Sequence, residues 1–251
     1  MSHLSTQDKL FFKRHGYLFK HNVLSAAHIS CALDALWTGI QADRHDPDTW
    51  VGAEPRSPVE PDHPALEATV TQSPVFEIAE ELAGRGTLRP CGPEAALNYP
   101  SGADKWSMPK LGHLDGYYMP FNGVPHGTVD RFMLGATIYL SDVEHRGGSF
   151  AVWPGSHLAA MDYFKTHALL DIRESSPERA FEVGPGKEFC AAAGSVCFWH
   201  GQLIHTGCTN ASRRIRMGLI VRFRRWDMSR ILFETPDDVW EYWEPLKSLA
   251  E

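Results

Sequence analysis

A histidine and an aspartate two residues apart are the first candidates for chemistry. His113 and Asp115 flank Leu114 in a segment bounded by two glycines. If this segment is extended, the two side chains point to the same face. They would then supply two ligands of a 2-His-1-carboxylate metal site, which needs one more histidine. Because a chain with 13 histidines contains such pairs by chance, the pair alone is weak evidence.

Two histidines near the C-terminal third compete for the role of third ligand. His205 follows the apolar pair Leu203-Ile204 on an expected strand and precedes a turn at residues 207–210. His200 lies at the other end of the same short stretch. The pattern of residues favours His205 and leaves His200 as its rival.

An arginine follows His205 at an interval of eleven residues. Arg216 lies in an expected strand over residues 214–221, where Arg214 and Arg216 share one face and large apolar residues occupy the other. An arginine inside a barrel is costly unless an anion meets it, and a carboxylate is its natural bidentate partner. The alternative is that this face belongs to an edge strand and is exposed to water.

The N-terminal part of the chain reads as helices around one strand. Ser5 and Asp8 resemble a capping box, and Gly16 is placed to end the helix that they start. The remaining expected elements are a strand over residues 17–23, a helix capped by Ser25, a helix from Pro74 to Gly84, and an irregular, proline-rich lid or rim over residues 43–64.

After residue 88 the sequence changes to short β-like runs separated by glycine and proline. The runs cover residues 95–99, 132–140, 149–153, 187–192, 195–199, 203–206 and 214–224. This spacing predicts an antiparallel sandwich or barrel, with helices gathered at the N-terminus and over residues 236–250. Neither an internal repeat nor a linker interrupts the chain, so a single domain over residues 1–251 is expected.

Composition excludes several classes of protein. The 251 residues are 43% hydrophobic and 22% charged, as in ordinary core-forming chains. The net charge of −7 argues against a nucleic-acid partner. Neither a membrane span nor a signal peptide is recognisable, so a cytoplasmic protein without membrane partners is expected. Five cysteines without a C-x-x-C pair indicate neither a disulfide framework nor a zinc knuckle.

Four motifs in order give the chain a resemblance to a known family. Residues 11–18 and 22–25 look like an opening segment, His113-Leu114-Asp115 like an HxD motif, and residues 147–157 like a glycine-rich strand with a PGSH turn. His205, Asn210 and Arg216 match a distal histidine and its trailing arginine. Together they resemble the phytanoyl-CoA dioxygenase-like (PhyH) branch of the Fe(II)/2-oxoglutarate-dependent oxygenases.

The resemblance implies a fold and a set of cofactors. The fold would be mainly β with flanking helices, arranged as a double-stranded β-helix, that is, a jelly-roll or cupin-like barrel. His113, Asp115 and His205 would bind Fe(II), and Arg216 would bind the distal carboxylate of 2-oxoglutarate. Three protein ligands leave three coordination positions, two for the chelating co-substrate and one for O₂.

The resemblance also places further residues around the co-substrate. Thr137 and Asn98 fall where the family has additional contacts, although ordinary strand positions explain them equally well. Gly207 stands where some relatives carry a hydroxyl residue, which puts that contact in doubt. His157 in the PGSH turn is expected to be structural. The carboxylate of Asp115 favours hydroxylation or another oxidation over chlorination, because halogenating relatives have a small residue there.

The expected substrate is a small-molecule metabolite or natural-product intermediate, oxidised with release of succinate and CO₂. Residues 101–112 and 157–179, with Trp106, Tyr117, Tyr118 and Phe121, are expected to ring the mouth of the barrel. A monomer or homodimer is expected. The alternative function is a catalytically inactive or metal-free jelly-roll binding protein, whereas a cupin is disfavoured because the chain has no HxH motif.

Overall fold

Two antiparallel sheets form the centre of the molecule. The computed structural model describes residues 2–118, 123–171 and 182–250. One sheet has five strands in the order β1 (Tyr17–Lys20), β6 (Val196–His200), β3 (Leu134–Tyr139), β8 (Gly218–Phe223) and β2 (Glu94–Ala95). The other has three, in the order β5 (Lys187–Phe189), β4 (Phe150–Val152) and β7 (His205–Gly207).

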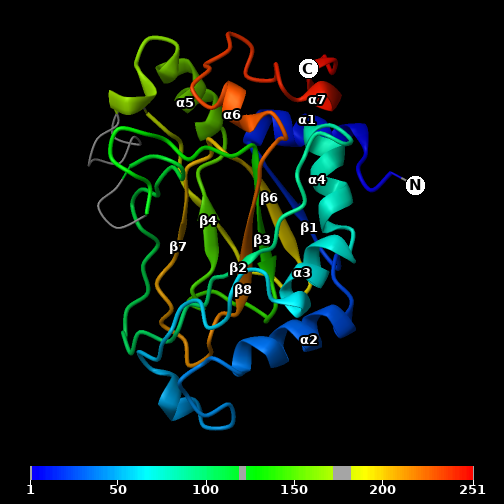
Figure 1. The fold of residues 1–251 in the computed structure, drawn as a ribbon. Helices are drawn as coiled ribbons and strands as arrows, with labels where there is room; N and C mark the ends of the chain where they lie inside the picture. Colours follow the sequence, from blue (N-terminus) through cyan, green and yellow to red (C-terminus); the bar gives the residue numbers. More distant parts are fainter. Residues whose placement is uncertain (1, 119–122, 172–181, 251) are drawn as a thin grey trace.

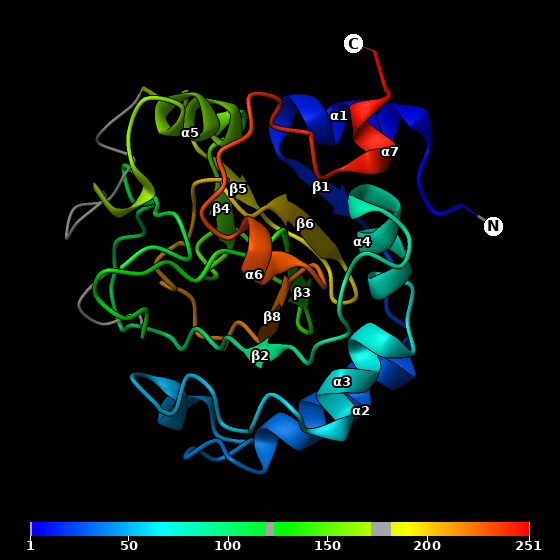
Figure 2. The ribbon, with the colours of Figure 1, turned by 45° about the horizontal axis from the view of Figure 1, so that its top comes forward.

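Helices cover one side and one end of these sheets. Figures 1 and 2 show the second, third and fourth helices beside the five-stranded sheet, and the first, fifth and last helices gathered at one end. The helices are α1 (Thr6–His15), α2 (Ala26–Trp37), α3 (Pro64–Thr71), α4 (Val75–Ala83), α5 (Ser156–Phe164), α6 (Met228–Ile231) and α7 (Glu244–Lys247), with 3₁₀ turns η1 (Pro47–Trp50) and η2 (Leu169–Asp171). No described helix is both long enough and apolar enough to cross a membrane.

Alternating side chains of the five-stranded sheet divide the interior into two layers. Leu134, Ala136 and Ile138 of β3 belong to the larger apolar cluster, which includes side chains of α2, α3 and α4. Tyr139 of β3 belongs instead to a second cluster with Trp199 and with Phe150 and Val152 of the three-stranded sheet. Because strand residues alternate between faces, one sheet can contact the helices on one side and the other sheet on the other.

The capping signals of the first helices are confirmed. The Ser5 hydroxyl accepts a hydrogen bond from the Asp8 amide, and the Asp8 carboxylate accepts one from the Ser5 amide, which completes the capping box of α1. Gly16 ends this helix with φ of 76°, in the left-handed region that favours glycine. Ser25 caps α2 through the amide of His28. Local hydrogen-bonding side chains therefore fix both helix starts.

Several expected elements differ from those observed. The sequence does not predict helices α3 and α5. Its pattern places Pro64 in an irregular segment and residues 157–179 in a loop. Pro64 is in fact the first residue of α3, a position that needs no amide donor. Conversely, the helix expected over residues 236–250 reduces to the single turn α7. Proline and glycine lie near the ends of these segments, but their presence does not show whether a segment forms a turn or a helix.

The strands are also shorter than expected at the end near residue 216. Beyond β2 and β8, only an isolated bridge joins Asn98 and Arg216. The carbonyl of Ala96 accepts a hydrogen bond from the Arg216 side chain at 2.8 Å. The Arg216 side chain therefore bonds to the backbone just beyond the last paired residues of β2.

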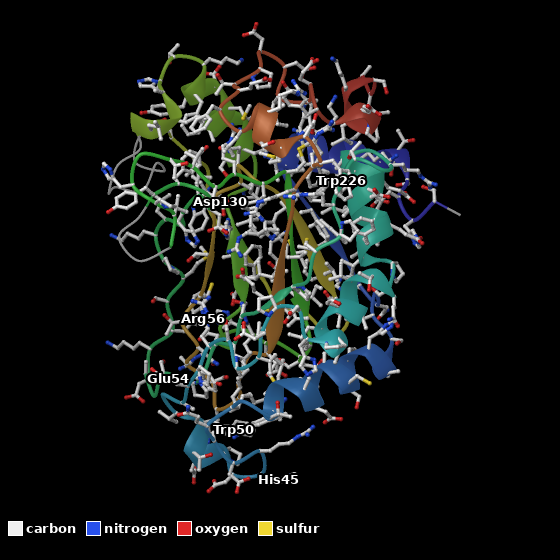
Figure 3. The ribbon with its side chains drawn as sticks, viewed as in Figure 1. His45, Trp50, Glu54, Arg56, Asp130 and Trp226 are labelled. Carbon is white, nitrogen blue, oxygen red and sulfur yellow. The ribbon has the colours of Figure 1, made fainter. Side chains whose placement is uncertain are left out.

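The proline-rich segment over residues 43–64 has two parts with different positions. Figure 3 shows Trp50 at the end of the molecule opposite Asp130 and Trp226. The later part runs beside β2, where the Ser57 hydroxyl donates to the Ala95 carbonyl at 2.7 Å. The later part therefore adjoins the edge of the five-stranded sheet.

Candidate metal centre

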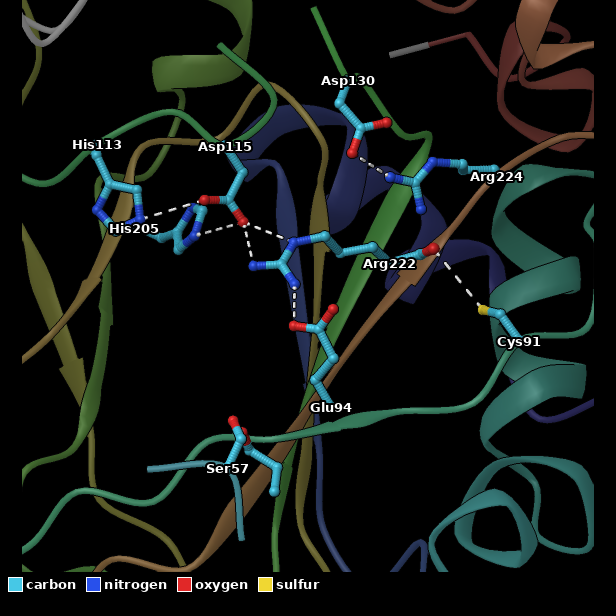
Figure 4. A network of polar contacts seen from close by, with 10 residues as sticks. Ser57, Cys91, Glu94, His113, Asp115, Asp130, His205, Arg222 and Arg224 are labelled. Atoms are coloured by element: carbon cyan, nitrogen blue, oxygen red, sulfur yellow. Dashed lines mark hydrogen bonds and ion pairs between the residues drawn. The ribbon is translucent and has the colours of Figure 1, made fainter. Parts of the chain in front are cut away.

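His113, Asp115 and His205 converge at one end of the three-stranded sheet. One side-chain ligand atom from each residue lies within 4.8 Å of the others. His113 Nε2 is 3.3 Å from Asp115 Oδ1, and His205 Nε2 is 3.7 Å from Asp115 Oδ2 (Figure 4). This is the one group of three or more potential metal ligands found among the described residues.

Backbone pairing holds the two histidines side by side. The amide of His113 donates to the carbonyl of His205 at 2.9 Å, and the reciprocal bond measures 3.1 Å. Gly112 permits this approach, because a Cβ there would collide with the His205 carbonyl and the Trp153 ring. Gly116, with φ of 85°, turns the chain away directly after Asp115. Two glycines therefore let the His-x-Asp segment lie against β7.

The surroundings of His205 favour a neutral imidazole aimed at Asp115. Its Nδ1 donates to the Leu203 carbonyl at 2.9 Å, which leaves Nε2 free to act as an acceptor or ligand. Trp199 covers the ring at a centroid distance of 4.1 Å. Burial lowers the pKa of His205, and the Asp115 carboxylate opposes this shift. Neutral imidazole is the form that binds metal ions.

His200 occupies a different environment from His205. Its Nδ1 accepts a hydrogen bond from the Gln202 amide at 3.0 Å, and its ring stacks on Trp243 at 4.9 Å. Burial holds the pKa of His200 well below its usual range, with further contributions from His157 and Arg131. Of the two rival histidines, the structure brings only His205 to Asp115.

Asp115 is ionised by its neighbours despite its burial. Burial alone would raise its pKa, but His205, His113 and Arg222 hold the pKa of this carboxyl well below its ordinary value. Arg222 donates to Asp115 Oδ2 from Nε at 2.9 Å and lies 2.8 Å away through Nη2. An ionised carboxylate beside two imidazoles is a suitable donor set for a divalent iron ion.

Arg216 is a buried cation with unused hydrogen-bonding capacity. Its side chain donates to the carbonyls of Ala96 at 2.8 Å and Gly148 at 3.4 Å, while Nε has no partner. No ion pair joins Arg216 to a carboxylate among the described residues. Burial lowers its pKa, while Tyr139 acts in the opposite direction. A buried guanidinium without a counter-charge fits an anionic ligand.

The two further co-substrate candidates already make protein contacts. The Thr137 hydroxyl accepts a hydrogen bond from Trp199 Nε1 at 3.2 Å, and Asn98 Nδ2 donates to the Cys208 carbonyl at 3.0 Å. Thr137 keeps its own hydroxyl proton for another acceptor. A Cβ built on Gly207 would meet nothing within 4 Å, so open space replaces the hydroxyl residue of some relatives.

The aromatic residues expected around the mouth are spread over different environments. Tyr117 is buried, stacks on Phe164 and donates to Gln202 at 2.8 Å. Trp106 lies against His145, and Tyr118 lies edge-on to His126. Phe121 falls outside the described residues.

A cavity of about 270 Å³ opens directly beside Asp115. Its lining is rich in charge, with ion pairs of 3.0 Å between Arg222 and Glu94 and of 2.8 Å between Arg224 and Asp130. The lining residues are Cys91, Gly92, Glu94, Asp115, Gly116, Val124, Asp130, Ile220, Arg222 and Arg224. Figure 3 shows Trp50 at the end of the molecule away from Asp130, which lines this cavity. The lid or rim expected over residues 43–64 stays a prediction.

Arg222 and Glu94 line the cavity beside Asp115, but the sequence does not single them out as site residues. Arg222 lies on β8 an even number of residues after Arg216, so both belong to the same strand face. This alternation is visible in the sequence, but only Arg216 lies at the family's interval from His205. Glu94 gave no local signal, because its position depends on the pairing of β2 with β8.

Comparisons with known proteins agree with this architecture. Residues 12–218 match the family model described as phytanoyl-CoA dioxygenase (PhyH). No curated protein sequence shows a significant match.

Solved structures with a similar fold include three proteins whose descriptions mention nogalamycin or hygromycin B. The non-heme alpha ketoglutarate dependent carbocyclase SnoK from nogalamycin biosynthesis is 24% identical, with a TM-score of 0.59, and the match covers 94% of this chain and 93% of that one. The epimerase SnoN with Fe³⁺, alpha ketoglutarate and nogalamycin RO is 22% identical, with coverage of 87% and 82% and a TM-score of 0.60. HygX from Streptomyces hygroscopicus with nickel, 2-oxoglutarate and hygromycin B is 16% identical, with coverage of 88% and 87% and a TM-score of 0.56. At these identities the likeness is one of fold.

Proposed function

The chain belongs to the phytanoyl-CoA dioxygenase family of Fe(II)/2-oxoglutarate-dependent oxygenases, and we propose that it oxidises a small molecule, most simply by hydroxylation. The observation that carries this proposal is the convergence of His113, Asp115 and His205 within 4.8 Å. Two imidazoles and one carboxylate are the donor set of non-haem iron oxygenases. We further propose that residues 1–251 form one domain and that the two sheets close as a jelly-roll barrel.

His113, Asp115 and His205 would hold the iron. When bound there, iron activates O₂ for substrate oxidation while 2-oxoglutarate is converted to succinate and CO₂. Asp115 favours hydroxylation over halogenation, because its carboxylate fills the position that a halide would need. The roles of the three residues are assigned from their geometry and from the family motif.

Arg216 would bind and orient the distal carboxylate of 2-oxoglutarate. Its buried charge and its free Nε support this role, since a planar guanidinium holds a carboxylate through two parallel hydrogen bonds. Thr137 and Asn98 are proposed to make further polar contacts with the same molecule. Trp199, Phe150 and Tyr139 would keep water away from this part of the interior.

The cavity beside Asp115 is the proposed substrate site. Its volume of about 270 Å³ holds a small molecule or one part of a larger one. Hydrogen-bonding groups of Glu94, Asp130, Arg222 and Arg224 line it, which suits a substrate with hydroxyl or amino groups. The relatives SnoN and HygX are crystallised with nogalamycin RO and hygromycin B, and a natural-product substrate is proposed by analogy. Trp106, Tyr117, Tyr118 and Phe121 remain candidates for contacts outside this cavity.

The direct test is co-substrate turnover by the purified protein. The parent supplied with Fe(II), 2-oxoglutarate and O₂ should release succinate, slowly alone and faster with its substrate. Asp115→Ala should lose both rates. Asp130→Asn is the matched control, because Asp130 lines the same cavity without belonging to the metal group, so it should keep the slow rate. An iron-loaded parent that releases no succinate under any substrate would instead indicate a binding protein.

A further inference from the structure

Two nitrogens of Arg222 contact one oxygen of the Asp115 carboxylate. Nε lies 2.9 Å and Nη2 lies 2.8 Å from the same atom, Oδ2 (Figure 4). His205 Nε2 is 3.7 Å from this oxygen, beyond hydrogen-bonding distance. Oδ1 instead faces His113 Nε2 at 3.3 Å. The two oxygens of Asp115 therefore have different environments.

Counting lone pairs shows what this contact does. An ionised carboxylate has about four lone-pair sites, or about two on each oxygen. On Oδ2, one of these sites accepts the charge-assisted hydrogen bond from Arg222 Nε, and Nη2 lies 2.8 Å from the same oxygen in an ion pair. Oδ1 receives no bond from Arg222 and faces His113. A metal ion placed among the three residues would thus find Oδ1 available and Oδ2 engaged.

Other contacts hold the guanidinium in this orientation. Its third nitrogen, Nη1, donates to Glu94 Oε2 at 3.0 Å. The guanidinium carbon lies 5.9 Å from the centre of the Phe132 ring, in a cation–π contact. Arg222 is also fixed by its strand register, since β8 pairs it with Gly135 of β3. Arg222 is therefore held from two sides as well as by its backbone.

We propose that Arg222 is a positioning residue that limits Asp115 to a single metal-binding oxygen, Oδ1. This proposal rests on the proposed function, because it concerns the same iron site. Two histidines and one carboxylate oxygen leave three positions of an octahedral ion for 2-oxoglutarate and O₂. If Oδ2 also bound, Asp115 would occupy one of those positions. Arg222 thus keeps a coordination position open without touching the metal.

The test compares Arg222→Met with Arg224→Met, using Co(II) as a spectroscopic probe and 2-oxoglutarate as ligand. Arg224 is a matched control, because it lines the same cavity and makes a 2.8 Å ion pair with Asp130 rather than with Asp115. Arg222→Met should bind Co(II) at least as tightly as the parent, but with changed visible absorption bands. Its metal-loaded form should bind 2-oxoglutarate about tenfold more weakly or worse. Arg224→Met should match the parent in all three measurements.

Each other outcome overturns a specific part of the account. Parent-like bands and parent-like 2-oxoglutarate affinity in Arg222→Met would reduce Arg222 to an ordinary ion pair. Loss of metal binding in that variant would mean that Arg222 supports Asp115 as a ligand rather than restricting it. If Arg222→Met does not fold, Arg222→Gln is assessed by the same criteria. A parent that binds no metal would instead refute the proposed function.

Discussion

Replacing Arg216 with methionine should weaken 2-oxoglutarate binding without removing the metal. Methionine keeps the length of an apolar side chain but removes the guanidinium. Arg216 uses two nitrogens for the Ala96 and Gly148 carbonyls, and the second of these bonds is long, at 3.4 Å. Nε has no partner, so the side chain has capacity left for a carboxylate.

The size of the effect follows from this hydrogen-bond inventory. A hydrogen bond to a charged group contributes about 1.5–3 kcal/mol, and truncating one member of a buried charge pair costs about 2–5 kcal/mol. Because Arg216 shares its donors with two carbonyls, an intermediate loss of about 3 kcal/mol is expected. That corresponds to a Kd for 2-oxoglutarate about 100- to 200-fold higher.

An anaerobic titration measures this change directly. 2-Oxoglutarate is added to the Fe(II)-loaded protein, and the visible absorption of the iron–2-oxoglutarate complex is followed. Arg213→Met is the control, because its side chain is 82% exposed and pairs with the equally exposed Asp48, so its Kd should stay near that of the parent. Thermal unfolding checks that each variant is folded. A folded Arg216→Met variant with the parent's Kd would refute the assignment of this arginine.

Three further predictions concern the scaffold. Gly112→Ala should weaken Fe(II) binding more than tenfold, because its Cβ would collide with the His205 carbonyl. Gly207→Ala should leave Fe(II) binding unchanged, because its Cβ would meet nothing within 4 Å. Calorimetric titration of the metal measures both affinities. Burial lowers the pKa of His157 to about 4, so the unfolded chain binds a proton at this residue before the folded chain does as pH falls from 6.5. His157 should therefore account for a loss of about 1.6 kcal/mol in the free energy of unfolding between pH 6.5 and 5, beside the loss from His200, whose pKa is also lowered. In urea unfolding, His157→Gln should lose only the His157 component. Ser5→Ala should destabilise the protein by about 1 kcal/mol in urea without changing metal affinity, since it removes only the cap of α1.

The sequence predicted those features that depend on short-range patterns. The caps at Ser5 and Ser25 and the end of α1 at Gly16 follow from side chains a few residues apart. The sequence also predicts a strand where β8 lies, although β8 begins at Gly218, two residues after Arg216. The order of motifs was sufficient to identify the family, because it depends on residues rather than on their positions in space.

Features that depend on long-range pairing could not be read from the sequence. Glu94 reaches Arg222 only because β2 pairs with β8 across more than one hundred intervening residues. The sequence favours His205 over His200, but the packing of the C-terminal Trp243 against His200 is visible only in the structure. The ends of β2 and β8 also depend on long-range contacts, such as the bond from the Arg216 side chain to the Ala96 carbonyl, which no local pattern predicts.

Anaerobic titration of Fe(II) into the metal-free protein tests the central claim most directly. The account predicts one tightly bound Fe(II) per chain in the parent and in His200→Asn, because His200 faces Gln202 and Trp243 rather than Asp115. His205→Ala should lose that binding, because it removes one of the three converging ligand atoms. Full iron affinity in a folded His205→Ala variant would contradict the account.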